Sequence, residues 1–177
     1  MDQFQESPIQ ISETSLEELQ QICQTETGGS QLFAILDACD EPRVPAIVQL
    51  LGEERAVSLY HGAAKRDYCA IAPYLVMVDK EVLIWIKEYL WDDPWGMFVR
   101  SRASLEDLRK HFRKYLLVKA PDGEQMYFRF YDPRVFSDFT SVLDTESMSF
   151  FNELESVVYM DNGELFQVRD RGKIASV

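Results

Sequence analysis

Short apolar runs alternate with segments of helical periodicity along most of this chain. Four runs are apolar and short enough for buried strands: 31–36, 56–60, 72–78 and 95–99. Between and after them, apolar residues recur at helical spacing over 43–51, 80–90 and 105–115. This alternation predicts a largely buried sheet with helices on its faces.

Two of the expected helices carry polar start signals. Asp79 can cap the second helix, which is apolar almost all round and is therefore expected to be largely buried. Ser104, with Asp107 three residues later, can cap the third. The third helix has one apolar stripe, so its basic residues are expected to face outward; the stripe is Leu105, Leu108, Phe112 and Tyr115.

The pattern changes after residue 119. Pro121-Asp122-Gly123 forms a turn signal between two apolar segments, and Asn162-Gly163 is the strongest short hairpin signal. Helical segments are expected between these turns, at about 133–143 and 145–154. The predicted fold class is α/β with α+β character: a mixed β-sheet flanked by helices, with antiparallel hairpins in the C-terminal half.

The chain of 177 residues is one domain by size, with a distinct beginning. Residues 1–30 are predicted to be a polar N-terminal segment, with a polar tail to residue 14. A short helix is expected from Ser15, which has capping-box spacing to Glu18, to about Cys23. Residues 31–177 are predicted to form a single domain.

Residues 126–134, MYFRFYDPR, combine a strand pattern with a helix start. Alternation places Met126, Phe128 and Phe130 on one face of the expected strand. Asp132 ends it, and Pro133 suits the first helical position because no N–H donor is needed there. The pattern therefore predicts a strand that runs directly into a helix.

Arg129 lies in the middle of this aromatic segment. An unpaired buried charge is costly, so the guanidinium must reach solvent or meet a carboxylate. Asp37, just after the first strand, and Asp132 are the candidates. An internal ion pair and contact with a ligand both remain open for Arg129.

Six segments appear in an order that resembles a known family: LFAILD (32–37), SLY (58–60), APYLV (72–76), WGMFVRSR (95–102), SLEDLRKHFRKYLLVKAPDG (104–123) and FRFYDPRV (128–135). Together they resemble the effector adaptor/chaperone family of bacterial type VI secretion, which carries a domain long labelled as of unknown function. The resemblance covers about residues 31–151.

This resemblance implies an adaptor that binds a toxic effector in the donor cytoplasm and promotes its loading onto the VgrG spike protein. It implies binding without chemistry and no cofactor. Two other functions stay open. The chain could be an immunity-type protein that binds a toxin to block it, or a small enzyme that uses Asp37 and Asp132 for acid–base chemistry.

The net charge of −12 disfavours nonspecific binding to nucleic acids and anionic membranes. The exception is the basic segment, residues 100–119, which carries seven bases and two acids. It is either a docking surface for an acidic partner or a solvated helix face. The predicted partner-binding residues are Arg100, Arg102, Arg109, Arg113, Lys114, Arg129, Tyr131 and Arg134.

Other chemistry-bearing residues show no site signature. His61 is expected in a turn and His111 on a solvated helix face, neither with a metal-binding partner at useful spacing. No nucleophile elbow, P-loop or dinucleotide fingerprint occurs. Trp85 is expected in the core, whereas core and interface positions both remain open for Trp91 and Trp95.

The cysteines and the termini favour a cytoplasmic protein. Cys23, Cys39 and Cys69 have no metal spacing and leave one thiol over if two pair, so reduced cysteines are the simplest account. The N-terminus shows no signal-peptide pattern. The longest apolar run, 68–78, is too short to cross a bilayer, so no stable membrane insertion is expected.

Overall fold

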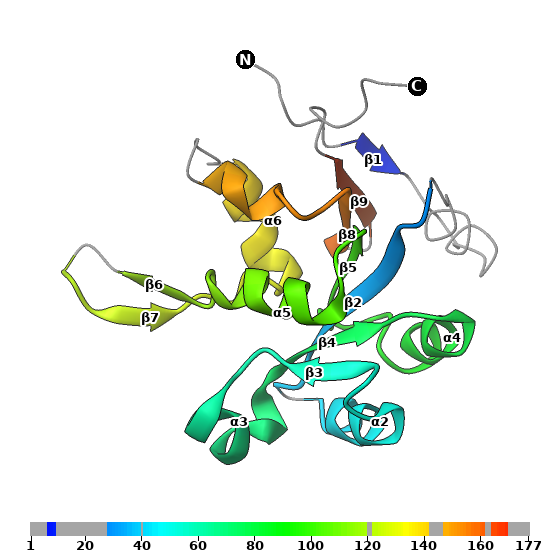
Figure 1. Ribbon diagram of the computed structural model, residues 1–177. Helices are drawn as coiled ribbons and strands as arrows, with labels where there is room; N and C mark the ends of the chain where they lie inside the picture. Colours follow the sequence, from blue (N-terminus) through cyan, green and yellow to red (C-terminus); the bar gives the residue numbers. More distant parts are fainter. Residues whose placement is uncertain are drawn as a thin grey trace.

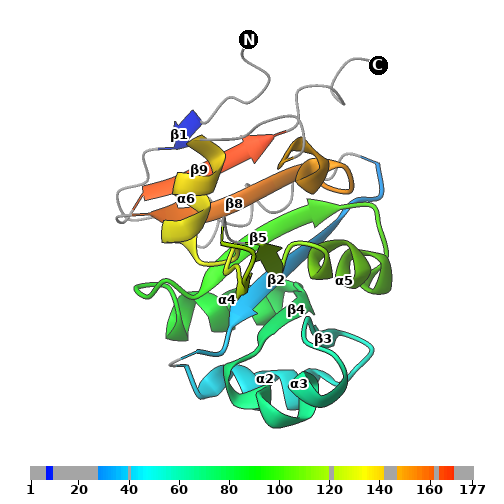
Figure 2. The same ribbon diagram turned by 90° about the vertical axis from the view of Figure 1, so that its left-hand side faces the viewer.

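A computed structural model describes residues 7–9, 28–39, 41–119, 122–141, 147–161 and 164–169. Seven strands form one sheet in the order β1-β9-β8-β5-β2-β4-β3 (Figures 1 and 2). Their bounds are Ser7–Ile9 (β1), Gln31–Asp37 (β2), Ala56–Ser58 (β3), Pro73–Met77 (β4), Gly96–Ser101 (β5), Ser156–Asp161 (β8) and Glu164–Arg169 (β9). The remaining strands, β6 (Leu117–Lys119) and β7 (Gln125–Tyr127), form a separate hairpin.

Strand β2 lies at the centre of the main sheet, between β5 and β4. Ile35 is opposite Leu75 of β4 on one side and Met97 of β5 on the other. The predicted fold class, a sheet flanked by helices with α+β character, is confirmed. Every described pairing is antiparallel, however, so the expected mixture of strand directions is absent from the described part. Strands buried on both faces are apolar throughout in either arrangement, so their pattern does not reveal direction.

The described α-helices are α2 (Arg43–Leu51), α3 (Gly62–Asp67), α4 (Lys80–Tyr89), α5 (Leu105–Arg113) and α6 (Pro133–Ser141). They cover both faces of the sheet, with α5 and α6 in front of it in Figure 2. One core unites Ala34 and Leu36 of β2 with α2 and α4, and the other unites Phe33 and Ile35 with α5 and α6. Successive side chains of one strand therefore enter opposite cores.

The predicted caps of α4 and α5 are confirmed. The Asp79 carboxylate accepts a hydrogen bond from the Val82 N–H at 2.9 Å, and the Ser104 hydroxyl accepts one from the Asp107 N–H at 3.1 Å. These bonds satisfy N–H groups that have no partner inside a helix. Helix α4 is less buried than expected, because Tyr89 is exposed.

The start of β5 approaches β2 so closely that it requires glycine. Gly96 has a φ of +139°, and a Cβ there would lie 1.8 Å from the carbonyl oxygen of Ile35. Next to it, the Asp37 N–H donates to the Trp95 carbonyl at 2.8 Å. This contact aligns the end of β2, where Asp37 stands, with β5.

Three expected boundaries differ from the structure. Residues 7–9 of the expected polar tail form β1, which pairs with β9. The strand expected over 126–131 ends at Tyr127, and the chain then turns, with the Asp132 N–H bonded to the Arg129 carbonyl at 3.0 Å. Within the range 145–154, where a helix was expected, the described residues form a shorter 3₁₀ helix, η2 (Ser147–Phe151). Burial of Phe130 and Tyr131 in the turn overrides the strand alternation.

Both expected hairpins are confirmed. Strand β6 pairs with β7, and β8 pairs with β9 so that Asp161 is opposite Glu164. Pro121, Asn162 and Gly163, as well as the helix expected near 15–23 with Cys23, lie outside the described residues. The β6–β7 hairpin extends away from the body of the domain (Figure 1).

Candidate functional site

Arg129 and Asp37 form an ion pair at the end of the central strand. The Arg129 Nη2 donates to Asp37 Oδ2, and the Cys39 N–H donates to Asp37 Oδ1 at 2.9 Å. Burial raises the pKa of Asp37 although these hydrogen bonds oppose the shift. Burial also disfavours the charged form of Arg129, but the bond to Asp37 outweighs it and raises the pKa of Arg129. The internal ion pair considered for Arg129 is therefore present.

Asp132 and Arg134 join the same group of charges. Arg134 binds the Asp132 carboxylate with Nε at 2.9 Å and Nη2 at 2.6 Å, and its backbone N–H donates to the same carboxylate at 3.1 Å. Arg129 Nη2 lies 3.8 Å from Asp132 Oδ2. Burial alone would raise the pKa of Asp132, but the bonds from Arg134 hold it below its usual value. The predicted start of a helix at Pro133 is confirmed.

These four residues, Asp37, Arg129, Asp132 and Arg134, are called the charge cluster below. The structure brings the two predicted carboxylates together, but each is bound by an arginine. Arg129 Nε is buried without a hydrogen-bond partner among the described residues. With two positive and two negative groups, the cluster joins β2 to the segment that follows the hairpin.

Two tyrosines lie beside the charge cluster. Tyr131 is buried, and its phenol shares a hydrogen bond with that of Tyr60. Burial, together with the nearby charge of Asp37, raises the pKa of Tyr131, and burial also raises that of Tyr60. Tyr131 was expected at the partner surface, but it is buried, and this corrects that expectation.

The β6–β7 hairpin presents an apolar surface next to this site. Its exposed apolar side chains are between 39% and 58% accessible: Leu117, Val118, Met126 and Tyr127. The Tyr127 ring lies 5.5 Å from that of Tyr60, so the hairpin contacts the end of β3. Grouped exposed apolar side chains are typical of protein-binding surfaces.

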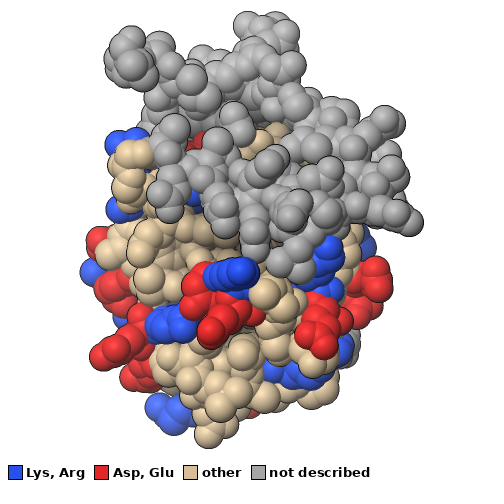
Figure 3. Space-filling model, turned by 90° about the vertical axis from the view of Figure 1, so that its right-hand side faces the viewer, with Lys and Arg blue, Asp and Glu red and all other residues tan. Residues whose placement is uncertain are grey.

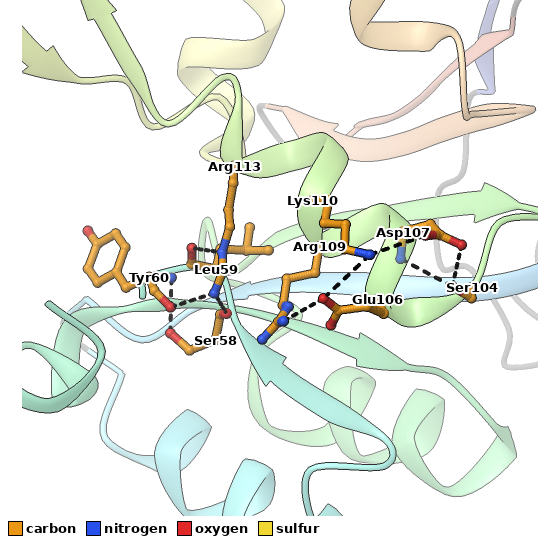
Figure 4. Close-up of polar contacts among 9 residues, drawn as sticks. All are labelled: Ser58, Leu59, Tyr60, Ser104, Glu106, Asp107, Arg109, Lys110 and Arg113. Atoms are coloured by element: carbon orange, nitrogen blue, oxygen red, sulfur yellow. Dashed lines mark hydrogen bonds and ion pairs between the residues drawn. The ribbon is translucent and has the colours of Figure 1, made fainter. Parts of the chain in front are cut away.

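The basic segment divides into different environments. Arg100 is buried in β5, where its Nη2 has no hydrogen-bond partner among the described residues. Arg102 pairs with Glu155 at 2.7 Å. Arg109 pairs with Glu106 on its own helix at 2.5 Å (Figure 4). Burial of Arg100 corrects the expectation that it lies on a partner-binding surface.

Arg113 points into the protein. Its Nε donates to the Leu59 carbonyl at 2.9 Å, and its Nη2 donates to those of Tyr60 at 2.9 Å and Ser58 at 3.3 Å (Figure 4). The expectation that Arg113 faces outward is therefore wrong, because the carbonyls at the end of edge strand β3 need donors. Lys114, the next residue, is exposed as expected.

His111 is also buried, contrary to the expected solvated position. Its Nε2 lies 2.7 Å from the Phe150 carbonyl, which holds α5 against η2. His61 is exposed. Cys39 and Cys69 are not joined in a disulfide, and the described residues contain no group of His, Cys, Asp and Glu that could hold a metal ion.

The tryptophans belong mainly to one core. Trp95 is buried, while Trp85 and Trp91 are half-buried against the same core. On the face nearest α4, basic and acidic side chains are intermixed in the described part of the surface (Figure 3). This described face therefore carries mixed charges, whereas the hairpin carries grouped apolar side chains.

Sequence reasoning missed Tyr60, Leu117, Val118 and Met126 as surface residues of the candidate site. Met126 was assigned to the apolar face of a strand. The available signal was the turn at Pro121-Asp122-Gly123, which predicts a hairpin of two strands. A hairpin of only two strands cannot bury both of its faces by itself, so some of its apolar residues must be exposed. None of the described helices is long and apolar enough to cross a membrane.

The structure thus defines an α+β domain with an apolar hairpin beside a buried charge cluster, which is a candidate protein-binding surface. A family described as domain of unknown function (DUF4123) matches residues 32–149, about two thirds of the chain, and the chain belongs to this family. Searches among curated proteins and among solved structures found no match.

Proposed function

We propose that this protein is an effector adaptor of type VI secretion. It binds a cognate effector in the donor cytoplasm and promotes loading of that effector onto the VgrG spike. The six segments that resemble such adaptors support this proposal, and all six fall within the matched residues 32–149. The effector and the spike are the two proposed partners.

The apolar hairpin is the observation that carries the proposal. The domain already buries two apolar cores, and the four accessible apolar side chains of the hairpin belong to neither of them. Exposed apolar groups are retained at surfaces that become buried in a complex. The proposed mechanism is binding without catalysis, with the hairpin covering an apolar part of the effector.

The charge cluster would position this surface. Arg129 lies two residues after β7 and Arg134 lies in the first turn of α6, and their side chains are held by buried carboxylates while remaining partly accessible, at 40% and 64%. A partner that approaches the hairpin would meet these two arginines at its base. Arginine next to aromatic residues is a common centre of binding energy in protein interfaces.

Co-purification from the native cell tests the proposal. A tagged protein is expected to carry one effector and a VgrG subunit, identified by mass. Deletion of the gene is expected to abolish delivery of that effector while the secretion machine still fires. Equal loss of every effector would contradict an adaptor role, and neutralisation of a toxin without delivery would support the immunity-type alternative.

A pair of variants tests the hairpin itself. Met126→Glu with Tyr127→Glu is expected to weaken effector capture by at least about tenfold, because charges replace apolar contacts. Leu50→Glu, on α2, is the matched control: Leu50 is 83% exposed but lies away from the hairpin, so capture is expected to persist. Equal capture by both variants would contradict the proposed surface.

The enzyme alternative rests on the meeting of Asp37 and Asp132 at Arg129. Asp37 is the stronger candidate for a catalytic acid because burial raises its pKa. The adaptor proposal expects a folded Asp37→Asn variant to deliver the effector normally. Loss of a measurable turnover in that variant would favour the enzyme instead.

A further inference from the structure

Both strands of the β6–β7 hairpin have an open edge, because they form a sheet of only two strands. Val118 is opposite Met126, and the Phe128 N–H donates to the Leu116 carbonyl at 2.8 Å. Hydrogen-bonded pairs alternate along an antiparallel ladder, so Val118 and Met126 bond to each other across the hairpin. The N–H and C=O groups of Leu117 and Lys119 then point outward from β6.

The two faces of β6 carry different side chains. Leu117 and Lys119 share one face, with Leu117 opposite Tyr127, and Val118 lies on the other face beside Met126. A strand added outside β6 would place its own side chains next to these residues in the same alternation. The hairpin therefore offers two apolar positions followed by a positive one.

The charges of the two edges differ. Lys119 on β6 and Lys114 at its base are exposed, and in the described part of the chain no carboxylate lies within ion-pair distance of either. The segment leading into β7 instead carries the exposed acids Asp122 and Glu124. In a protein of net charge −12, the β6 edge thus favours an acidic partner.

We propose that an extended segment of the partner pairs with β6 as a third strand. The segment runs antiparallel to β6, as in every described strand pair, so its recognised order is a carboxylate opposite Lys119 and then two adjacent apolar residues opposite Val118 and Leu117. Backbone hydrogen bonds provide affinity and the side chains provide selectivity, as in other cases of strand addition. This proposal deepens the proposed function and rests on it for the identity of the partner, an effector segment.

A second copy of the chain fits the same edge poorly. Pairing of β6 with β6 would bring two sets of Lys114 and Lys119 together, and lysine on an edge strand opposes such self-pairing. Two copies of an acidic protein also repel each other overall. A partner segment that carries a carboxylate attracts these lysines instead of repelling them, and it does not bring a second copy of the acidic domain.

Proline substitution tests the edge without disturbing the ladder inside the hairpin. Lys119→Pro removes an outward N–H from β6, and Gln125→Pro removes the outward N–H of the residue directly opposite on β7. Lys119→Gln removes the charge but keeps the N–H. The probes are fluorescein-labelled nonapeptides with a central Glu-Ile-Val, and the same peptides with Lys in place of Glu, measured by fluorescence anisotropy on the full chain.

The Glu peptide is expected to bind at least about tenfold more tightly than the Lys peptide, with an affinity that falls as salt is added. Lys119→Pro is expected to weaken binding by about tenfold, Lys119→Gln by about threefold, and Gln125→Pro by less than about twofold. Circular dichroism verifies that each variant is folded. If Lys119→Pro does not fold, Leu117→Pro, which removes the other outward N–H, takes its place.

Equal binding of the two peptides, binding of neither, or equal effects of the two proline variants would overturn the proposal. A dimer of the wild type that Lys119→Pro abolishes, seen by sedimentation, would instead assign the edge to a second copy. Capture of an effector from cells that is unaffected by Lys119→Pro would overturn the third strand but leave the adaptor function standing. If the peptides bind as expected but no effector is captured from cells, the third-strand proposal stands and the adaptor function is contradicted.

Discussion

Arg129 donates a hydrogen bond to Asp37, a residue 92 positions earlier in the chain. The bond joins the end of the central strand β2 to the segment that leaves the hairpin. Because the Asp37 side chain is only 3% exposed, removal of its partner leaves a buried carboxylate without its cation. The contact thus connects the stability of the fold to the placement of the candidate site.

Arg129→Met is expected to lower the free energy of unfolding by about 2 kcal/mol, less than for a fully buried pair because Arg129 is 40% exposed. Arg102→Met, which breaks the exposed pair with Glu155, is the control and is expected to cost less than about 1 kcal/mol. Urea unfolding measures both. Equal losses of unfolding free energy would show that the buried pair contributes no more to stability than the exposed pair.

Gly96→Ala is expected to destabilise the protein severely, by more than about 4 kcal/mol, or to prevent folding. The new methyl group would overlap the Ile35 carbonyl in the central strand. Gly52→Ala is the matched control: its φ is +74°, but a Cβ there meets no atom within 4 Å, so a loss of about 1 kcal/mol is expected. Soluble yield and urea midpoints compare the two, and a mild effect of Gly96→Ala would contradict the close approach.

Arg113→Met is expected to cost about 2 kcal/mol, because three backbone carbonyls at the end of β3 lose their donor. Lys114→Met, one residue later and exposed, is expected to change stability by less than about 0.5 kcal/mol. The loss of the Arg113 bonds should also free Tyr60, observed as faster amide exchange at residues 58–60. Equal free energies of unfolding for the two variants would contradict the hydrogen bonds of Arg113 and indicate that its side chain is solvated.

Asp132 is expected to make stability depend on pH in the acid range. Its pKa is lowered in the folded state, so its contribution is present above the ordinary aspartate pKa of about 3.9 and is lost as the pH falls through the folded value. Asp37, whose pKa is raised by burial, acts with the opposite sign: its contribution is present below about 3.9 and is lost as the pH rises through its folded value.

The cost of Asp132→Asn is therefore expected to be largest near neutral pH, at about 1–2 kcal/mol, and to shrink on acidification. Urea unfolding at a series of pH values from about 7 to about 3 measures it. The control is Asp92→Asn, at an exposed position outside the charge cluster. A cost of Asp132→Asn that stays constant with pH would mean that only its helix-start hydrogen bond matters.

The sequence by itself determined the features that depend on neighbouring residues. Continuous apolar runs marked β2, β4 and β5, and the caps of α4 and α5 followed from Asp79 and Ser104. The turn after β6 and the helix start at Asp132 were predicted for the same reason. Each involves atoms a few residues apart, so local conformational preference decides it.

Only the tertiary structure decided which distant groups meet. A helical stripe indicates that Phe112 is buried, but not that Arg113 reaches the carbonyls of β3 or that His111 reaches Phe150. The choice of Asp37 as the partner of Arg129, the antiparallel strand directions and the exposure of both faces of the hairpin also depend on packing across the whole chain. Apolar periodicity shows what must be buried, whereas the surface that buries it is set by the global arrangement.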